Sequence, residues 1–361
     1  MMKGQLELRP RRLVALCLLP LGLLSAVTMA SEFNARGNIV IADQFNNRVI
    51  EVDPRTHRVV WTFGNGSDQP GPHSVVGVND AERFGPFTLV SGTGIPAASP
   101  PLPGCSTPAT GCPDNRVMIV SPTGRILWQY GQAGVTGADA NQLNTPVAAT
   151  VVSNFPGHEG LHVLITDQGN ARVILVNLLH RIVWQYGMTM VPGLGPNLLN
   201  NPNSAELLSN GHILIADENN NRAIEVTVGK ALVHEYTAGG TMSGVAFASR
   251  LRNGNTLVSD SNNNRIIEVS PADAIVWEYD TNTEAGSNPS PLPTRAVRLA
   301  NGNTLISDQF NNRVIEVNPQ KQIVFQQGAF AAGNGFNQLN GPYDAKVVGD
   351  FTGLTPPFGG D

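Results

Sequence analysis

Short apolar runs alternate with polar turns along most of the chain, and one such unit recurs six times. A clear copy is GNTLISDQFNNRVIEVNP at Gly302; similar copies begin at Gly37, Gly211 and Gly254, a weaker one at His162, and an interrupted one at Phe87 that resumes at Asn115. An arginine shared by all copies recurs at spacings of 68, 56, 50, 43 and 48 residues, at Arg48, Arg116, Arg172, Arg222, Arg265 and Arg313. Repeats of this length without helical periodicity predict a radial or solenoidal array of strands.

The unit between Pro202 and Tyr236 indicates how each repeat folds. Four strand-length runs are separated by turn residues, at 204–208, 212–216, 223–226 and 231–236. Four antiparallel strands make one propeller blade, whereas a solenoid needs parallel coils of shorter period. We therefore predict an all-β fold, a six-bladed β-propeller of four-stranded antiparallel blades.

The two ends of the repeat region are complementary. The segment GPYDAKVVGD at 341–350 matches the first strand of a unit, but no second strand follows it. The N-terminal unit opens at Asn38 with a second strand and lacks a first. We expect the N- and C-terminal strands to pair in one blade and close the ring, which removes an exposed edge strand.

The first thirty residues have the features of a secretory signal peptide. An apolar run from 13 to 27 follows four basic residues, Lys3, Arg9, Arg11 and Arg12, and the small residues of a cleavage position come after it, up to Ala30. The apolar run is shorter than the roughly 20 residues that a membrane span needs. We expect export to a secreted or periplasmic location with removal of 1–30, a single propeller domain at 31–350, and a Pro/Gly-rich tail at 351–361.

Net charge limits the classes of binding partner that we expect, and the cysteines predict a disulfide. Without residues 1–30 the chain has 19 basic and 27 acidic residues, a formal net charge of −8. An acidic chain without a basic cluster disfavours nucleic acid and anionic membranes, and we expect a monomer. Cys105 and Cys112 lie in the interrupted repeat and are predicted to form a disulfide. A metal-binding pair is the weaker alternative, because no histidine or third cysteine lies near them.

An Asp–Arg pair recurs in the central turn of five repeats, at Asp43 and Arg48, Asp167 and Arg172, Asp217 and Arg222, Asp260 and Arg265, and Asp308 and Arg313. One pair per blade distributes these carboxylates around the ring, so they do not gather as calcium ligands. We expect each Asp to accept hydrogen bonds from turn amides and from an arginine of its own or a neighbouring blade.

The tryptophans also follow the repeat. All four occupy the fourth strand of a unit, at Trp61, Trp128, Trp184 and Trp277. A sugar-binding platform is one interpretation, but repetition favours packing between the outer strands of adjacent blades.

The combined pattern N-G-x-x-L-I-x-D-x-x-N-N-R-V-I-E-V, with blade-entry runs such as NQLNTP at Asn141 and NQLNGP at Asn337, resembles the NHL repeat. The blade ending IVWQYG is similar to repeats of quinoprotein-like and bacterial arylsulfotransferase-like propellers. The resemblance covers 37–350 and implies the propeller fold. It does not imply one function, since NHL propellers include adhesive modules, nucleic-acid binders and a few lyases or hydrolases. The second repeat departs most, with Gly92 in place of the Asp.

Long connections concentrate on one face of the predicted ring. The turns between second and third strands and the connections between blades emerge together, and the long loops among them are 64–78, 95–114, 187–201 and 280–293. Long loops on a rigid scaffold usually carry binding sites. We therefore expect a protein, a polysaccharide or a small molecule to bind this long-loop face.

The mouth of the central channel supplies candidate ligand-binding residues. The residue before the repeat's alanine in each innermost strand is, blade by blade, Asp344, Asp80, Ala148, Ser204, Phe247 and Arg295. Two carboxylates beside an arginine suit a cation or a polar substrate. A surface ion pair without a function is the alternative interpretation.

Enzyme signatures are weak. No metal-binding histidine spacing or G-x-S-x-G motif stands out, and only His73 falls in a favoured loop. We predict a binding or assembly module without catalysis or cofactor. The alternative is a pore-centred enzyme: a calcium-dependent hydrolase or lactonase, a lyase, or an arylsulfotransferase-like transferase. Asp80 and Asp344 would then be candidate ligands for calcium in the central channel.

Overall fold

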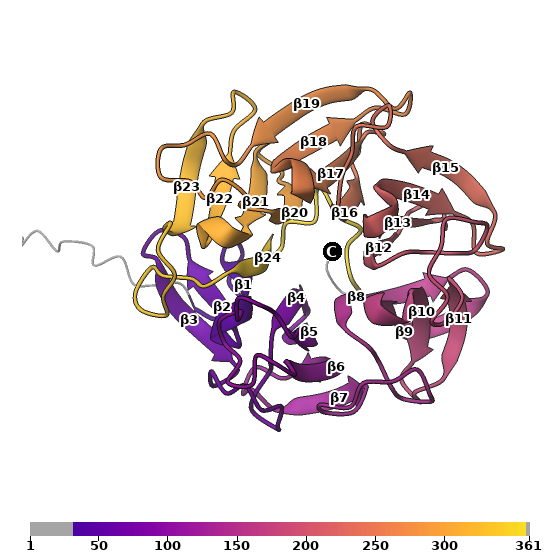
Figure 1. Cartoon of the computed structure of the whole chain (residues 1–361), viewed down its shortest axis with the longest axis horizontal. Coiled ribbons are helices and arrows are strands. Elements are labelled where there is room, and N and C mark those ends of the chain that lie inside the picture. Colours follow the sequence, from indigo (N-terminus) through magenta and orange to yellow (C-terminus); the bar gives the residue numbers. More distant parts are fainter. Residues whose placement is uncertain (1–31, 359–361) are drawn as a thin grey trace, which may run out of the picture.

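The structure, a computed structural model, describes residues 32–358. The expected signal peptide at 1–30 lies outside the described residues. Six four-stranded antiparallel sheets stand around a central axis, which confirms the predicted six-bladed propeller (Figure 1). Within 32–358, no helix has the length and apolar character that a membrane span requires.

The blades are numbered along the chain, and the strands of each are given from the inside of the ring outward. Blade 1 contains β24 (Pro342–Val347), β1 (Ile39–Asp43), β2 (Arg48–Asp53) and β3 (Arg58–Phe63). Blade 2 contains β4 (Val78–Phe84), β5 (Phe87–Ile95), β6 (Cys112–Val120) and β7 (Ile126–Tyr130). Blade 3 contains β8 (Pro146–Phe155), β9 (His158–Asp167), β10 (Arg172–Asn177) and β11 (Ile182–Tyr186).

Blade 4 contains β12 (Pro202–Leu207), β13 (Ile213–Asp217), β14 (Arg222–Val226) and β15 (Leu232–Tyr236). Blade 5 contains β16 (Val245–Arg250), β17 (Thr256–Asp260), β18 (Arg265–Val269) and β19 (Ile275–Asp280). Blade 6 contains β20 (Pro293–Arg298), β21 (Thr304–Asp308), β22 (Arg313–Val317) and β23 (Ile323–Gly328). Short 3₁₀ turns join the second and third strands of five blades: η1 (Gln44–Asn46), η2 (Gln168–Asn170), η3 (Glu218–Asn220), η4 (Ser261–Asn263) and η5 (Gln309–Asn311).

Blade 1 combines strands from both ends of the chain. β24 pairs antiparallel with β1, with Ile41 opposite Ala345. The innermost strand of this blade therefore comes from the C-terminal end of the chain, while its three outer strands come from the N-terminal end (Figure 1).

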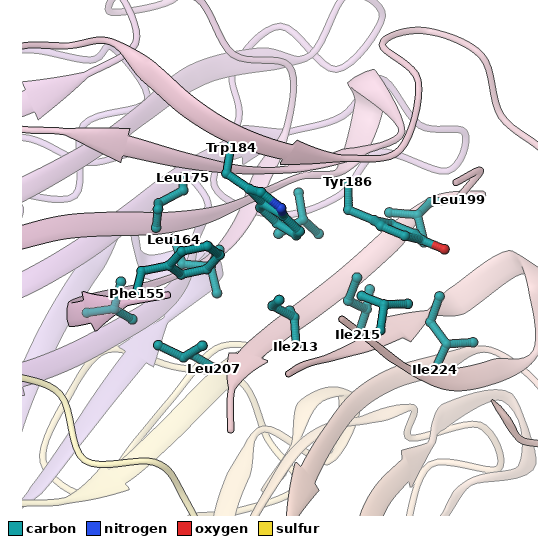
Figure 2. Close-up of a cluster of buried hydrophobic side chains, with 13 residues drawn as sticks. Phe155, Leu164, Leu175, Trp184, Tyr186, Leu199, Leu207, Ile213, Ile215 and Ile224 are labelled. Carbon is teal, nitrogen blue, oxygen red and sulfur yellow. The ribbon is translucent and has the colours of Figure 1, made fainter. Parts of the chain in front are cut away.

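The apolar core lies between neighbouring blades. Between blades 3 and 4, Trp184, Phe155 and Leu175 pack against Ile213 and Ile215 (Figure 2). The tryptophans also tie the outer strands together, as predicted. Each indole N–H donates to a carbonyl of the next blade, from Trp61 to Pro122, Trp128 to Leu178, Trp184 to Val228 and Trp277 to Pro319.

The recurrent Asp–Arg pairs flank the 3₁₀ turns between the second and third strands and stabilise them. Asp308 Oδ2 accepts from Arg313 Nε and from Asn311 Nδ2, both at 2.8 Å, and the carboxylate is fully buried. The same Arg-to-Asp bond, at 2.7–2.8 Å, recurs for Asp43, Asp167, Asp217 and Asp260. Four of these five carboxylates also accept a backbone N–H from the preceding inter-blade loop. The pairs therefore act within single blades, as the turn interpretation predicts.

In blade 2, an aspartate from elsewhere in the sequence takes the place of the repeat aspartate. A Cβ atom on Gly92 would lie 2.7 Å from Cγ of Asp114, so the Asp114 carboxylate occupies the place of the missing repeat side chain. Arg116 donates to both oxygens of Asp114, and one oxygen also accepts from Val76 N at 2.7 Å. Asp114 is the last residue of the 95–114 insertion. The insertion therefore carries its own replacement for the aspartate.

Candidate functional site

The two ends of the central channel have different surroundings. We call the face that carries the 3₁₀ turns and the inter-blade connections the upper face; it is the long-loop face of the sequence analysis. The opposite face, where the innermost strands end, is the lower face. Successive residues of a strand point to opposite sides, so every second residue of each innermost strand faces the channel.

The structure brings Asp80 and Asp344 together, as expected, but through a residue that the sequence analysis did not select. Lys346 Nζ lies 2.5 Å from Asp80 Oδ1 and 2.5 Å from Asp344 Oδ2. All three side chains are largely buried. The ion pair is therefore internal and does not lie on the surface, and an ion pair without a binding function stays an open interpretation.

These carboxylates also join blades. Asp344 Oδ2 accepts from Ala81 N at 3.2 Å, and Asp80 Oδ2 accepts from Ala149 N at 2.7 Å. Ser204 Oγ accepts from Ala248 N at 3.3 Å. In each case the side chain before the repeat's alanine binds the backbone of the next innermost strand and so joins two blades. Within 32–358, Asp344 Oδ1 is buried without a hydrogen-bond partner.

Arg295 is not the cation that pairs with Asp344. Its guanidinium extends across the channel, where Nη1 donates to Ala246 O at 2.9 Å and to Asn203 Oδ1 at 3.0 Å, and Nη2 donates to Val147 O at 3.3 Å. Its Cζ lies 5.3 Å from the Phe247 ring centre and 5.0 Å from that of Tyr343. Arg295 therefore connects blades 3, 4, 5 and 6 and forms a partition across the channel.

Below Arg295, the channel holds a small charged cavity of about 50 Å³. Glu82 and Glu206 line it together with Asp80, Lys346 and Arg295. Burial raises the pKa of Glu82 to about 8 and that of Glu206 to about 7. Burial also raises the pKa of Asp344 to about 6, against the opposing effect of Lys346. For Asp80 the desolvation is outweighed by Lys346 and its other partners, so its pKa is lowered.

The C-terminal segment covers this cavity on the lower face. Thr355 N donates to Glu206 Oε1 at 2.6 Å, Phe358 N to Val151 O at 3.2 Å, and Ala300 N to Asp350 Oδ2 at 2.8 Å. Leu354, Thr355 and Pro356 line the cavity, and the segment after β24 lies at the centre of the ring (Figure 1). The described part of the expected tail, 351–358, is thus packed against the propeller, and we call it the C-terminal strap.

The upper face has a larger pocket of about 390 Å³ around the channel mouth. Gln309 Nε2 donates to Gln44 Oε1 at 2.7 Å, and Gln44 Nε2 donates to Asn79 Oδ1 at 2.8 Å. Thr93, Gln168 and Tyr343 also line the pocket. We call Gln44, Asn79 and Gln309 the amide chain.

A second polar group borders the amide chain. Glu218 Oε2 accepts from Asn203 Nδ2 at 2.8 Å and from Gln168 Nε2 at 3.1 Å. Asn203 Nδ2 also lies 2.9 Å from Tyr343 Oη, and its carbonyl oxygen binds Arg295. Burial raises the pKa of Glu218. Hydrogen bonds therefore link the upper mouth to the Arg295 partition.

One wall of the upper pocket is apolar. Phe45, Phe310, Ile95 and Leu102 line it, and the rings of Phe45 and Phe310 stack with centres 6.2 Å apart. Ile95 and Leu102 come from the 95–114 insertion. The disulfide between Cys105 and Cys112 closes this insertion, with a Cα–Cα distance of 5.7 Å, and confirms the predicted pairing. The long-loop face thus contributes directly to the pocket, at the loop where we expected binding.

The sequence carried a signal for the residues that were missed. Lys346, Glu82 and Glu206 each lie two residues after a position that we had selected, so strand alternation alone places them in the channel. Gln44, Gln168, Glu218 and Gln309 each follow the repeat aspartate directly. Within 32–358, no group of three or more His, Cys, Asp or Glu residues is arranged to hold a metal ion.

Comparisons with known proteins show a similarity in fold alone. No family model matches the sequence, and no curated protein matches it. A protein of unknown function from Bacteroides caccae has a similar structure, with a TM-score of 0.51 and 12% identity over 81% of this chain and 93% of that one.

Lower TM-scores are found for two lyases. For virginiamycin B lyase from Staphylococcus aureus the TM-score is 0.47, with 13% identity over 80% of this chain and 83% of that one. For a streptogramin B lyase the TM-score is 0.48, with 13% identity over 85% of this chain and 88% of that one. Identities this low leave activity to be argued from the residues of this chain.

Proposed function

We propose that this chain is an exported, NHL-like propeller that acts as a binding module, with its ligand bound in the upper mouth of the central channel. The observation that carries the proposal is the contrast in how polar groups are used. Each channel carboxylate below Arg295 is engaged through at least one oxygen, with Lys346, with backbone N–H groups or with Thr150, although Asp344 Oδ1 accepts no hydrogen bond within 32–358. The amide chain above it retains donors and acceptors that face an open pocket.

Geometry supports the upper mouth over the lower one. Small-molecule sites are commonly pockets of about 300–1,000 Å³, apolar in part and with a few convergent polar groups. The upper pocket, at about 390 Å³, falls in this range. The lower cavity has about 50 Å³ and lies beneath the C-terminal strap. The long-loop face therefore offers the better-shaped site.

Localisation and partners are part of the same proposal. The disulfide that closes the 95–114 insertion suits an oxidising compartment, in agreement with the leader-like pattern at 1–30. The acidic charge of the exported chain disfavours nucleic acid and anionic membranes. We propose a monomer without a cofactor, and burial of the apolar clusters between neighbouring blades within the one chain supports the monomer.

A thermal-shift screen tests the module and its location together. The exported chain is tested with neutral oligosaccharides, short uncharged peptides and small polar metabolites, beside the double variant Gln44→Ala/Gln309→Ala. Gln322→Ala, at an exposed turn of the lower face, is the matched control. We expect at least one compound to stabilise the parent and the control but not the double variant. Stabilisation retained by the double variant would place the site elsewhere, and no stabilisation by any compound would contradict the binding role.

A further inference from the structure

We propose that the upper mouth binds a neutral saccharide, with the apolar side of a sugar ring against the Phe45–Phe310 wall and its hydroxyl groups bonded to the amide chain. This inference rests on the proposed function, because it names the ligand class of the same pocket. Three properties of the pocket support it: an uncharged lining, side-chain donors and acceptors without a partner, and the presence of both a polar and an apolar wall.

The pocket is lined without a charged side chain. Its polar lining consists of amides and hydroxyls, which include Gln44, Asn79, Gln309, Thr93 and Tyr343. The nearby Glu218 does not line the pocket, and its Oε2 accepts from three amide N–H groups, of Gln168, Asn201 and Asn203. A charged ligand would lose hydration here without gaining a counter-charge, which is costly. A neutral ligand avoids this cost.

The amide chain offers donors and acceptors side by side. A side-chain amide has two N–H donors and a carbonyl that accepts twice. Gln44 uses one N–H toward Asn79 and accepts once from Gln309. Among the hydrogen bonds within 32–358, neither Asn79 Nδ2 nor Gln309 Oε1 takes part in any. Adjacent unused donors and acceptors suit neighbouring hydroxyl groups, because each hydroxyl both donates and accepts.

The apolar wall suits the other side of a sugar ring. A pyranose presents hydroxyls at its edge and C–H groups on its faces, and such faces pack on aromatic and aliphatic side chains. Phe45 and Phe310 come from the identical DQFNNR turns of blades 1 and 6, which are neighbours in the ring. Ile95 and Leu102 of the disulfide-closed insertion extend this wall. One wall therefore matches the apolar face and the other matches the hydroxyls.

A peptide is the competing occupant, and the pocket favours it less. One recurring way to hold an extended peptide is by backbone hydrogen bonds to an exposed sheet edge. The groups that converge here are side-chain amides and hydroxyls around a mouth of limited volume. These groups recognise a compact polyhydroxylated ligand better than an extended chain.

Isothermal titration calorimetry tests the inference with defined probes. The exported chain is titrated with di- and trisaccharides of glucose, galactose, mannose and N-acetylglucosamine, and with the charged galacturonate and glucosamine oligomers. We expect at least one neutral saccharide to bind, with its charged counterpart weaker by about tenfold or more. Such a difference corresponds to about 1.4 kcal/mol.

Variants locate the binding. Gln309→Leu and Asn79→Leu each remove the unused polar groups at similar size, and each is expected to weaken the neutral saccharide by about tenfold or more, because the sugar hydroxyls would be left unpaired. Gln322→Leu is the matched control, and the melting temperature of each variant confirms folding. Unchanged affinity in both mouth variants would overturn the inference and the proposed location together.

The outcomes separate the ligand class from the function. If no saccharide binds while an uncharged peptide or metabolite does, and Gln309→Leu abolishes that binding, the saccharide class is wrong and the binding module stands. If charged and neutral saccharides bind equally, the argument from the uncharged lining fails. If no probe binds, both proposals fail.

Discussion

The two ends of the channel are formed by the same six blades and yet use polar residues in opposite ways. At the lower end, Lys346, Asp80 and Asp344 bind one another and the neighbouring strands, and the C-terminal strap covers them. At the upper end, an uncharged amide chain borders a pocket of about 390 Å³. The difference teaches that charge inside a propeller channel is not by itself a sign of a binding site.

The physical reason lies in the cost of burying charge. A buried ion that loses its partner destabilises a protein strongly, so buried charges persist where they are paired and hydrogen-bonded. Amides cost less to bury and can leave part of their hydrogen-bonding capacity for a ligand. Under the proposed function, the lower end belongs to the scaffold and the upper end to recognition, and each of the following changes should affect one end more than the other.

The largest effect should come from removing the closing strand. Truncation after Asn340 removes β24 with Asp344 and Lys346, exposes the edge of β1, and should cause aggregation or loss of cooperative unfolding. Truncation after Asp350 removes only the strap and should leave a cooperative transition at a modestly lower temperature. Calorimetry of both proteins measures this. A protein without β24 that melts like the full chain would show that the ring does not depend on it.

Removing the shared cation should have the next largest effect. Lys346→Met keeps the length of the side chain but leaves Asp80 and Asp344 buried beside each other without their cation. We expect a loss of about 3–5 kcal/mol in the free energy of unfolding, as for other broken buried ion pairs. Urea denaturation provides the measurement, and Lys321→Met at an exposed lower-face turn is the control. A loss similar to that of the control would mean that the lower charges do not support the ring.

The pH dependence of stability should identify Glu82. Its pKa in the folded protein, about 8, lies above the ordinary value of 4.5, chiefly because of burial. The folded state therefore holds this proton more tightly than the unfolded state, so the contribution of Glu82 to stability is complete below about pH 4.5 and is lost as the pH rises through about 8.

Glu82→Gln keeps the acceptor for Thr150 and removes the titration. The variant should be more stable than the parent near pH 9, and this difference should disappear toward pH 4, each pKa unit being worth about 1.4 kcal/mol. Melting temperatures across this range measure it, with the exposed Glu159→Gln as the control. A constant difference at all pH values would contradict the raised pKa.

The repeat pattern was sufficient to predict most of the fold. Six repeats, each with four strand-length runs separated by turn residues, predicted six four-stranded blades. The recurrence of the tryptophans and of the Asp–Arg pairs predicted their structural roles between and within blades. The replacement of the aspartate at Gly92 by Asp114 was not predictable, because these residues meet only after the insertion has folded back.

The candidate site was predicted less completely. Strand alternation from Asp344 would have identified Lys346, but the reach of Arg295 across the channel depends on a long side chain and on carbonyls of three other blades. The bond from Thr355 N to Glu206 is likewise a tertiary contact without a repeat pattern. The amides after each repeat aspartate were visible in the sequence, but their convergence required the ring geometry.

The smallest expected effect is the response to calcium. Asp80 and Asp344 would be the natural ligands in the channel, yet both already bind the ammonium group of Lys346. A bound ion would have to displace this cation or add a second positive charge beside it, which Coulomb repulsion opposes. We therefore expect no change in melting temperature when calcium is added or chelated.

A real site would produce a clear signal, since ligand at a hundredfold excess over Kd stabilises the folded state by about 2.7 kcal/mol. Asp344→Asn is the informative variant, because it removes the charge and nearly preserves shape. A calcium-dependent rise in melting temperature that disappears in Asp344→Asn would make the lower end a metal site and would favour the calcium-dependent enzyme over the binding module. If the melting temperature rises in neither protein, Lys346 is the cation that the lower channel carboxylates bind, and the uncharged upper mouth stays the proposed site of recognition.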